Sequence, residues 1–165
     1  MASRLMAPAT FASAAATPPL LGSGELPATV QPPEKPLAVL HLVRSLEVGG
    51  LERLVVDLTC ARGIEQSQVA CLRAPGAFAE RLQQVGGRVT SHAGRDSRLA
   101  RLRWLSGVLR THRPDVLHCH GLYAFLHAGL LSLTHRMPAL VLTKHGREIP
   151  ATPLIHWLLP WLLRR

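Results

Sequence analysis

The sequence predicts an α/β fold: a single domain with a Rossmann-like parallel sheet and helices on both faces. Short runs rich in Val and Leu alternate with longer segments in which apolar residues recur at helical spacing. Glycine or proline separates many of these segments, as at Gly86-Gly87 and Pro114. Strands and helices that alternate at this spacing form a parallel sheet with right-handed crossovers.

The first half of the folded region is expected to hold three strands and two helices. The strands are the apolar runs 37–44, 68–72 and 88–92. The first helix spans 51–62, and the second opens at Pro75-Gly76 and closes at Gly86-Gly87. Their inward faces are expected to carry Leu51, Leu54, Val55, Leu58 and Ala61 in the first helix, and Phe78, Leu82 and Val85 in the second.

The second half continues the alternation. A helix from about Asp96 to His112 ends before Pro114, a strand follows at 116–119, a helix at 123–134 and a last strand at 139–144. The first of these helices is expected to turn four leucines inward: Leu99, Leu102, Leu105 and Leu109.

Composition divides the chain into three parts. Residues 1–36 are rich in Ala, Pro, Thr and Ser and are expected to be a disordered tail, residues 37–150 form the domain, and residues 151–165 are an apolar helical segment. The last segment, with Trp157, Trp161 and a basic end, is either a packing helix or a membrane-surface anchor. No run is long and apolar enough to span a bilayer.

The charge and the cysteines indicate partners and compartment. A formal net charge of +9 favours phosphate-bearing ligands, an anionic membrane surface or nucleic acid. Aromatic residues make up only 4 % and no helix-turn-helix or zinc pattern occurs, so nucleic acid is not an expected partner. The three cysteines lie in apolar segments and are expected to be buried thiols in the cytoplasm.

A basic cluster lies on and around the third expected helix. It is either an ordinary solvated face or a surface for an anionic leaflet, which would make the protein peripheral to the inner membrane. Its members are Arg95, Arg98, Arg101, Arg103, Arg110 and Arg113.

The diglycine Gly49-Gly50 stands between the first expected strand and its helix. Two residues without a Cβ let a ligand approach the backbone, and the helix that follows offers free amides to an anion. The other interpretation is a tight turn that binds nothing. No G-x-G-x-x-G and no Gly-Lys-Ser/Thr is present, so neither a dinucleotide fingerprint nor a P-loop is predicted. Glu52 is expected to act as a partner of the helix dipole.

Histidines occur at the ends of later strands. His118 and His120 are expected to point to opposite faces of their strand, which argues against a metal site, and His41 is expected to be a core residue. His145, followed by Gly146, should face the cleft at the end of the last strand, where its imidazole could donate a hydrogen bond or titrate. A structural histidine that caps the strand is the alternative.

In their order and spacing these motifs resemble the amino-terminal domain of family 4 glycosyltransferases, which have the two-domain GT-B fold. The residues that carry the resemblance are Gly49-Gly50-Leu51-Glu52-Arg53, the run 114–121 and Thr143-Lys144-His145-Gly146-Arg147-Glu148. It implies retaining transfer of a sugar from a nucleotide-sugar donor to a glycan, lipid-linked or small-molecule acceptor, with no cofactor. It also implies that Gly49 and Gly50 lie beside the donor phosphates and acceptor, and that His145 is the catalytic residue near the reacting sugar. His120 is expected to shape the acceptor pocket, and Gly146 is expected to belong to the same acceptor- and phosphate-binding set.

The sequence departs from that family in one respect. The 165 residues do not include a second Rossmann domain with paired glutamates, so we expect a fragment that is inactive alone. The alternative is a non-catalytic binding subunit that docks with a separate donor-domain partner chain.

Overall fold

The computed structural model describes residues 35–94 and 97–144. Within them strands and helices alternate as the sequence predicts, with ends that differ by a few residues. The elements, in chain order, are β1 (Val39–Val43), α1 (Gly50–Arg62), β2 (Ser67–Cys71), α2 (Ala77–Gln84), β3 (Arg88–Ser91), α3 (Arg98–His112), β4 (Val116–His120), α4 (Leu122–Ser132) and β5 (Ala139–Thr143).

The five strands form one parallel sheet in the order β3-β2-β1-β4-β5, which confirms the predicted α/β, Rossmann-like class. All five residues of the central strand β1 are buried, as expected when helices cover both faces of a parallel sheet. From β1 the chain proceeds to β2 and β3 on one side, whereas β4 and β5 lie on the other side. The boundary between β1 and β4 is therefore the point where the strand order reverses, the usual ligand-binding position in open α/β sheets.

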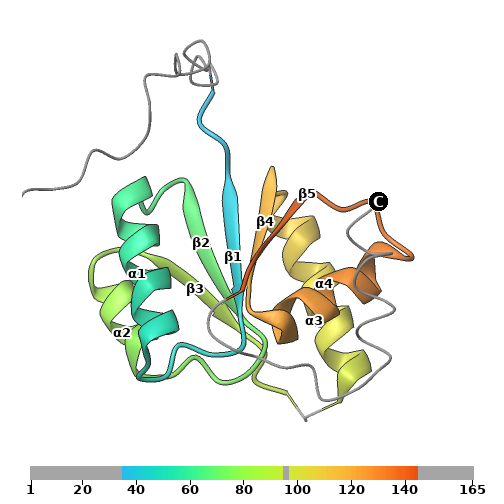
Figure 1. Cartoon of the computed structure of the whole chain (residues 1–165), viewed down its shortest axis with the longest axis horizontal. Coiled ribbons are helices and arrows are strands. Elements are labelled where there is room, and N and C mark those ends of the chain that lie inside the picture. Colours follow the sequence, from blue (N-terminus) through green and yellow to red (C-terminus); the bar gives the residue numbers. More distant parts are fainter. Residues whose placement is uncertain (1–34, 95–96, 145–165) are drawn as a thin grey trace, which may run out of the picture. The chain divides into compact units, whose positions relative to one another are not determined.

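Helices cover both faces of the sheet (Figure 1). On one face the core is formed by Val43, Val69, Val55 of α1 and Leu82 of α2. On the other face α3 and α4 pack on the sheet, and Phe125 of α4, only 1 % exposed, lies among the leucines of that core. Burial of these side chains supplies most of the favourable free energy of folding.

The inward face of α1 differs from the prediction. Leu54 and Leu58 are 40 % and 38 % exposed, whereas Val56 and Thr59 are buried beside Val55. Thr59 tolerates burial because its hydroxyl donates a hydrogen bond of 2.7 Å to the carbonyl of Val55.

The inward faces of α2 and α3 also differ in part from the prediction. In α2, Leu82 is fully buried as predicted, but Val85 is 54 % exposed. In α3, Leu105 is buried and Leu99 is 66 % exposed, and the buried positions include the charged Arg101. Apolar spacing identified the helices but not the stripe of each that meets the sheet.

The cysteines only partly follow the prediction. Cys71 and Cys119 are buried, and burial raises the pKa of both thiols, that of Cys71 to about 12. Cys60 is exposed on α1, so its expected burial is wrong, and all three are free thiols. Among the described residues, none of the helices combines the length and apolar character needed to cross a membrane.

Candidate functional site at the carboxyl edge of the sheet

The diglycine turn lies where β1 ends and α1 begins, at the switch point. Gly49 is the N-cap of α1 and Gly50 its first residue, and the amide of Arg53 donates the first helical hydrogen bond, 3.1 Å long, to the carbonyl of Gly49. Glu52 lies in the first turn, as expected of a dipole partner, and its carboxylate lies beside Gly49. The free amides of this helix end point to the edge where ligands bind in such sheets.

The loop that carries the diglycine is held by the loop after β2. The amide of Leu46 donates to the carbonyl of Pro75 at 2.7 Å, and the amide of Phe78 donates to the carbonyl of Leu46 at 2.9 Å. Gly76 lies between these two bonds with φ 81° and ψ 172°, a region that is essentially restricted to glycine. A Cβ on Gly76 would lie 2.5 Å from the backbone nitrogen of Glu47. The sequence showed Gly76 only as a helix opener and did not reveal that it positions the first loop.

On the other side of the switch point, Gly121 is the N-cap of α4. It has φ 84°, and its amide donates to the carbonyl of Thr143 at 2.9 Å, which ties the end of β4 to the end of β5. The guanidinium carbon of Arg44, after β1, lies 5.6 Å from the ring centroid of Tyr123 in the first turn of α4. The hydroxyl of Tyr123 is buried and has no hydrogen-bond partner among the described residues. Neither Arg44 nor Tyr123 was singled out from the sequence.

A cavity of about 410 Å³ lies at the same carboxyl edge, beyond β1, β2 and β3. Its walls include Glu47, Arg73 and His92, so it presents both signs of charge. The imidazole of His92 lies 5.8 Å, between ring centroids, from the indole of Trp104. Only the paired ends of β2 and β3 bring Arg73 and His92 together, so sequence inspection could not connect them.

His118 and His120 share one face of β4, so the expectation that they point to opposite faces is wrong. Their ring centroids are 4.1 Å apart, because residues two apart in a strand project on the same side. His41 joins them from β1, where it is aligned with His118. Its Nδ1 lies 3.0 Å from Nε2 of His120, within hydrogen-bond distance.

The three histidines differ in environment. His41 and His120 are 3 % and 2 % exposed, and His118 is half-buried with its Nε2 2.7 Å from the hydroxyl of Thr143. Burial lowers the pKa of His41 to about 4, and His118 and Arg62 act in the same direction. His41 is a core residue, as predicted, and is neutral near pH 7. Within the described residues, His120 contacts the other two histidines, and its predicted role in an acceptor pocket stays a prediction.

Two predicted site residues, His145 and Gly146, lie outside the described residues, as does the apolar segment 151–165. The backbone leads toward them from Thr143, the last residue of β5. Their expected roles therefore stay predictions.

The basic cluster around α3 is not one uniform surface. Arg101 is buried, and its Nε donates to Nε2 of His127 at 3.3 Å, whereas Arg98 and Arg103 are exposed. Burial lowers the pKa of His127, with Arg101 and Arg98 adding to that effect and the carbonyl of Tyr123 opposing it. Arg101 is thus part of the contact between α3 and α4 and cannot meet a membrane.

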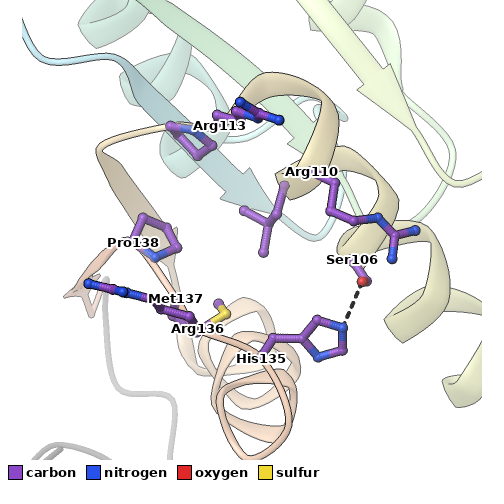
Figure 2. A pocket seen from close by; sticks show the side chains of 9 residues that line it. Ser106, Arg110, Arg113, His135, Arg136, Met137 and Pro138 are labelled. Carbon is purple, nitrogen blue, oxygen red and sulfur yellow. Dashed lines mark hydrogen bonds between the residues drawn. The ribbon is translucent and has the colours of Figure 1, made fainter.

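Another cavity, of about 260 Å³, lies at the opposite edge, beside Pro114 and Pro138, which precede β4 and β5 (Figure 2). Figure 2 shows the imidazole of His135 facing the hydroxyl of Ser106, at 3.0 Å. Arg110, Arg113 and Arg136 also line it. Because ligands of open parallel sheets bind beyond the carboxyl ends of the strands, the carboxyl edge is the candidate site.

Comparisons with known proteins bear on the fold and the family of this chain. The fold resembles the crystal structure of Anabaena Alr3699/HepE in complex with UDP and glucose, with a TM-score of 0.53 and 22 % sequence identity. That match covers 78 % of this chain and 35 % of the Anabaena chain, so this chain spans about a third of its length. A search of curated protein sequences found no significant match.

The model of the family described as Glycosyltransferase Family 4 matches residues 48–165, a span that begins one residue before the diglycine turn and includes β4 and β5. This match extends over more than half of the chain and so establishes membership of the family. The observed sheet agrees with the GT-B fold expected from the sequence. The chain therefore belongs to glycosyltransferase family 4.

Proposed function

We propose that this chain is the acceptor-side domain of a retaining glycosyltransferase that transfers a sugar from a nucleotide-sugar donor. The observation that carries the proposal is the position of Gly49-Gly50 at the switch point between β1 and β4, with free helix amides at the edge of the sheet. Arg44 and Arg73, beside this edge, add positive charge that suits phosphate groups. We assign the domain to residues 37–150, with 1–36 as a tail and 151–165 as the segment that leads to a second domain.

The proposal assigns the acceptor and the nucleotide mainly to different domains. The acceptor, a glycan, lipid-linked or small molecule, binds along the edge formed by the loops after β1 and β4. A second domain, supplied by a longer chain or a partner, provides most of the grip on the nucleotide, and the edge at Gly49-Gly50 faces the donor phosphates. UDP and glucose are the ligands of the Anabaena protein, and UDP-glucose is therefore a reasonable first probe. His145 is proposed to be the catalytic residue near the reacting sugar, and Gly146 to contact the acceptor or the phosphates.

The test is an NMR titration of the ¹⁵N-labelled chain with UDP-glucose and, separately, with short oligosaccharides. We expect chemical-shift changes concentrated at Gly49–Arg53 and at Gly121–Tyr123. Gly49→Asp, which places a carboxylate at the helix end, should weaken nucleotide-sugar binding about tenfold, a typical size for one lost charge contact. Arg136→Gln, at the opposite edge, is the control and should bind normally. Shift changes confined to the cavity of Figure 2 would contradict the proposal.

Turnover separates the two versions of this function. If the chain needs a donor domain, the purified protein releases UDP from UDP-glucose very slowly or not at all, because the edge at Gly49-Gly50 supplies only part of the stabilisation that the departing diphosphate needs. The alternative is a non-catalytic binding subunit. It would form a stable complex with a donor-domain protein, and that protein would be no more active in the complex than alone. Rapid turnover by the chain alone would contradict both versions.

We also propose a cytoplasmic location, peripheral to the inner membrane, for a lipid-linked acceptor. The exposed guanidiniums of Arg98 and Arg103 are available to an anionic leaflet, whereas Arg101 is not. Cosedimentation with vesicles that contain anionic lipid should fall for Arg98→Gln with Arg103→Gln. Unchanged cosedimentation of that double variant would exclude this helix as the membrane contact.

A further inference from the structure

Three imidazoles meet on the face of the sheet where β1 and β4 pair. One ring nitrogen each from His41, His118 and His120 lies within 4.8 Å of the others. The ring centroid of His41 is 5.3 Å from that of His118 and 5.2 Å from that of His120. We propose that His41, His118 and His120 form a binding site for a divalent transition metal ion such as Zn²⁺ or Ni²⁺.

The donor set selects the class of ion. Three imidazole nitrogens without a carboxylate suit Zn²⁺, Ni²⁺, Co²⁺ and Cu²⁺, whereas Mg²⁺ and Ca²⁺ prefer oxygen ligands. Nitrogens bound tetrahedrally to Zn²⁺ lie roughly 3.3 Å from one another, given a Zn–N distance of about 2.0 Å. His41 and His120 already place two nitrogens 3.0 Å apart. Because Nε2 of His118 is bonded to Thr143, its Nδ1 is the nitrogen that would complete the set, and the fourth position would be left for water.

The surroundings provide access and support. A cavity of about 460 Å³ reaches His41 and His118 and is also lined by Leu58 and Arg62 of α1. The hydroxyl of Thr143, 2.7 Å from Nε2 of His118, holds that ring, as outer-shell partners hold metal-binding histidines. The ligands lie on paired strands, which limits their movement relative to one another.

One nearby charge opposes a cation. Arg62 lies in the same cavity as His41, and its positive charge acts on that imidazole. Removal of this charge should therefore tighten metal binding. The sign of that effect is specific to a cation and would be reversed for an anionic ligand.

The test is titration of the tag-free chain with Zn²⁺ by calorimetry and with Co²⁺ by visible absorption. Every protein carries Cys60→Ser, because the exposed thiol of Cys60 could itself bind these ions. We expect one ion per chain, a Co²⁺ spectrum of low coordination number and no binding of Mg²⁺. His118→Gln should weaken Zn²⁺ binding at least tenfold, and Thr143→Val should weaken it by a smaller factor.

Two further variants complete the design. Arg62→Gln should bind Zn²⁺ several-fold more tightly, and His112→Gln, a histidine of the last turn of α3, should bind it as the parent does. Circular dichroism checks that each variant is folded. Equal affinity in the parent and in folded His118→Gln, or loss of affinity in His112→Gln, would overturn the proposal. The readouts involve no sugar transfer, so the inference stands or fails independently of the proposed function.

Discussion

The substitution that best tests how the loop of Gly49-Gly50 is held in place is Gly76→Ala. Gly76 has φ 81° and ψ 172°, and a Cβ there would lie 2.5 Å from the nitrogen of Glu47 and from the carbonyl carbon of Leu46. A non-glycine residue in this region costs about 1–3 kcal/mol, and the contact with backbone atoms adds to that. We therefore expect a loss of about 3 kcal/mol in the free energy of unfolding, a large part of the margin of an ordinary domain.

The assay is urea unfolding together with the thermal midpoint. For a domain of this size, about 3 kcal/mol corresponds to a fall in Tm of roughly 10 °C. Gly50→Ala is the matched control, because its Cβ would meet nothing within 4 Å and Ala is at least as favourable as Gly in a helix. A Tm of Gly76→Ala within about 2 °C of the parent would refute the idea that this glycine holds the loop of Gly49-Gly50.

Three other predictions concern stability. Phe125→Ala should cost about 3–5 kcal/mol in urea unfolding, since the ring is fully buried in the core beneath α3 and α4; a cost below about 1 kcal/mol would contradict that packing. Arg101→Gln should cost about 1–3 kcal/mol because it breaks the buried bond to His127, whereas Arg103→Gln, on the exposed side of α3, should stay within about 0.5 kcal/mol of the parent. Because the folded state lowers the pKa of His41 from 6.5 to about 4, the unfolded chain binds the proton more readily, and stability should fall as pH drops from 6.5. With a chelator present, the free energy of unfolding should fall by about 3 kcal/mol between pH 6.5 and pH 4, and by less in His41→Gln. If the free energy of unfolding falls equally steeply with pH in both proteins, groups other than His41 cause the fall.

The strands were predictable because both faces of a parallel sheet are buried. Each strand then reads as a short continuous apolar run, and β1 is the clearest case. The helices were predictable as helices but not in their orientation. In α1 the leucines Leu54 and Leu58 are as apolar as Val55, yet the sheet contacts the stripe that carries Thr59, whose hydroxyl is satisfied within the helix. Hydropathy cannot show that internal bond.

The candidate site was only partly predictable. Residues two apart in a strand face the same way, so the pairing of His118 with His120 could have been inferred once β4 was placed. The contribution of His41 could not, because it depends on the pairing of β1 with β4, strands separated by more than 70 residues of chain. The same holds for Arg44 and Tyr123, which meet only because α4 starts beside the end of β1.

The glycines at the carboxyl edge fall into two kinds. Gly76 and Gly121, with φ 81° and 84°, have conformations that favour glycine for reasons of folding alone. Gly49 is extended, with φ −174°, and Gly50 is the first residue of a helix, so other residues could adopt both conformations. The diglycine therefore does not depend on dihedral angles that other residues avoid. A Cβ on Gly49 would meet only the Glu52 side chain, which is flexible, and one on Gly50 would meet open space. Neither packing nor backbone geometry requires glycine at these two positions, and the absence of a Cβ leaves the helix end open to the close approach of a ligand that we propose.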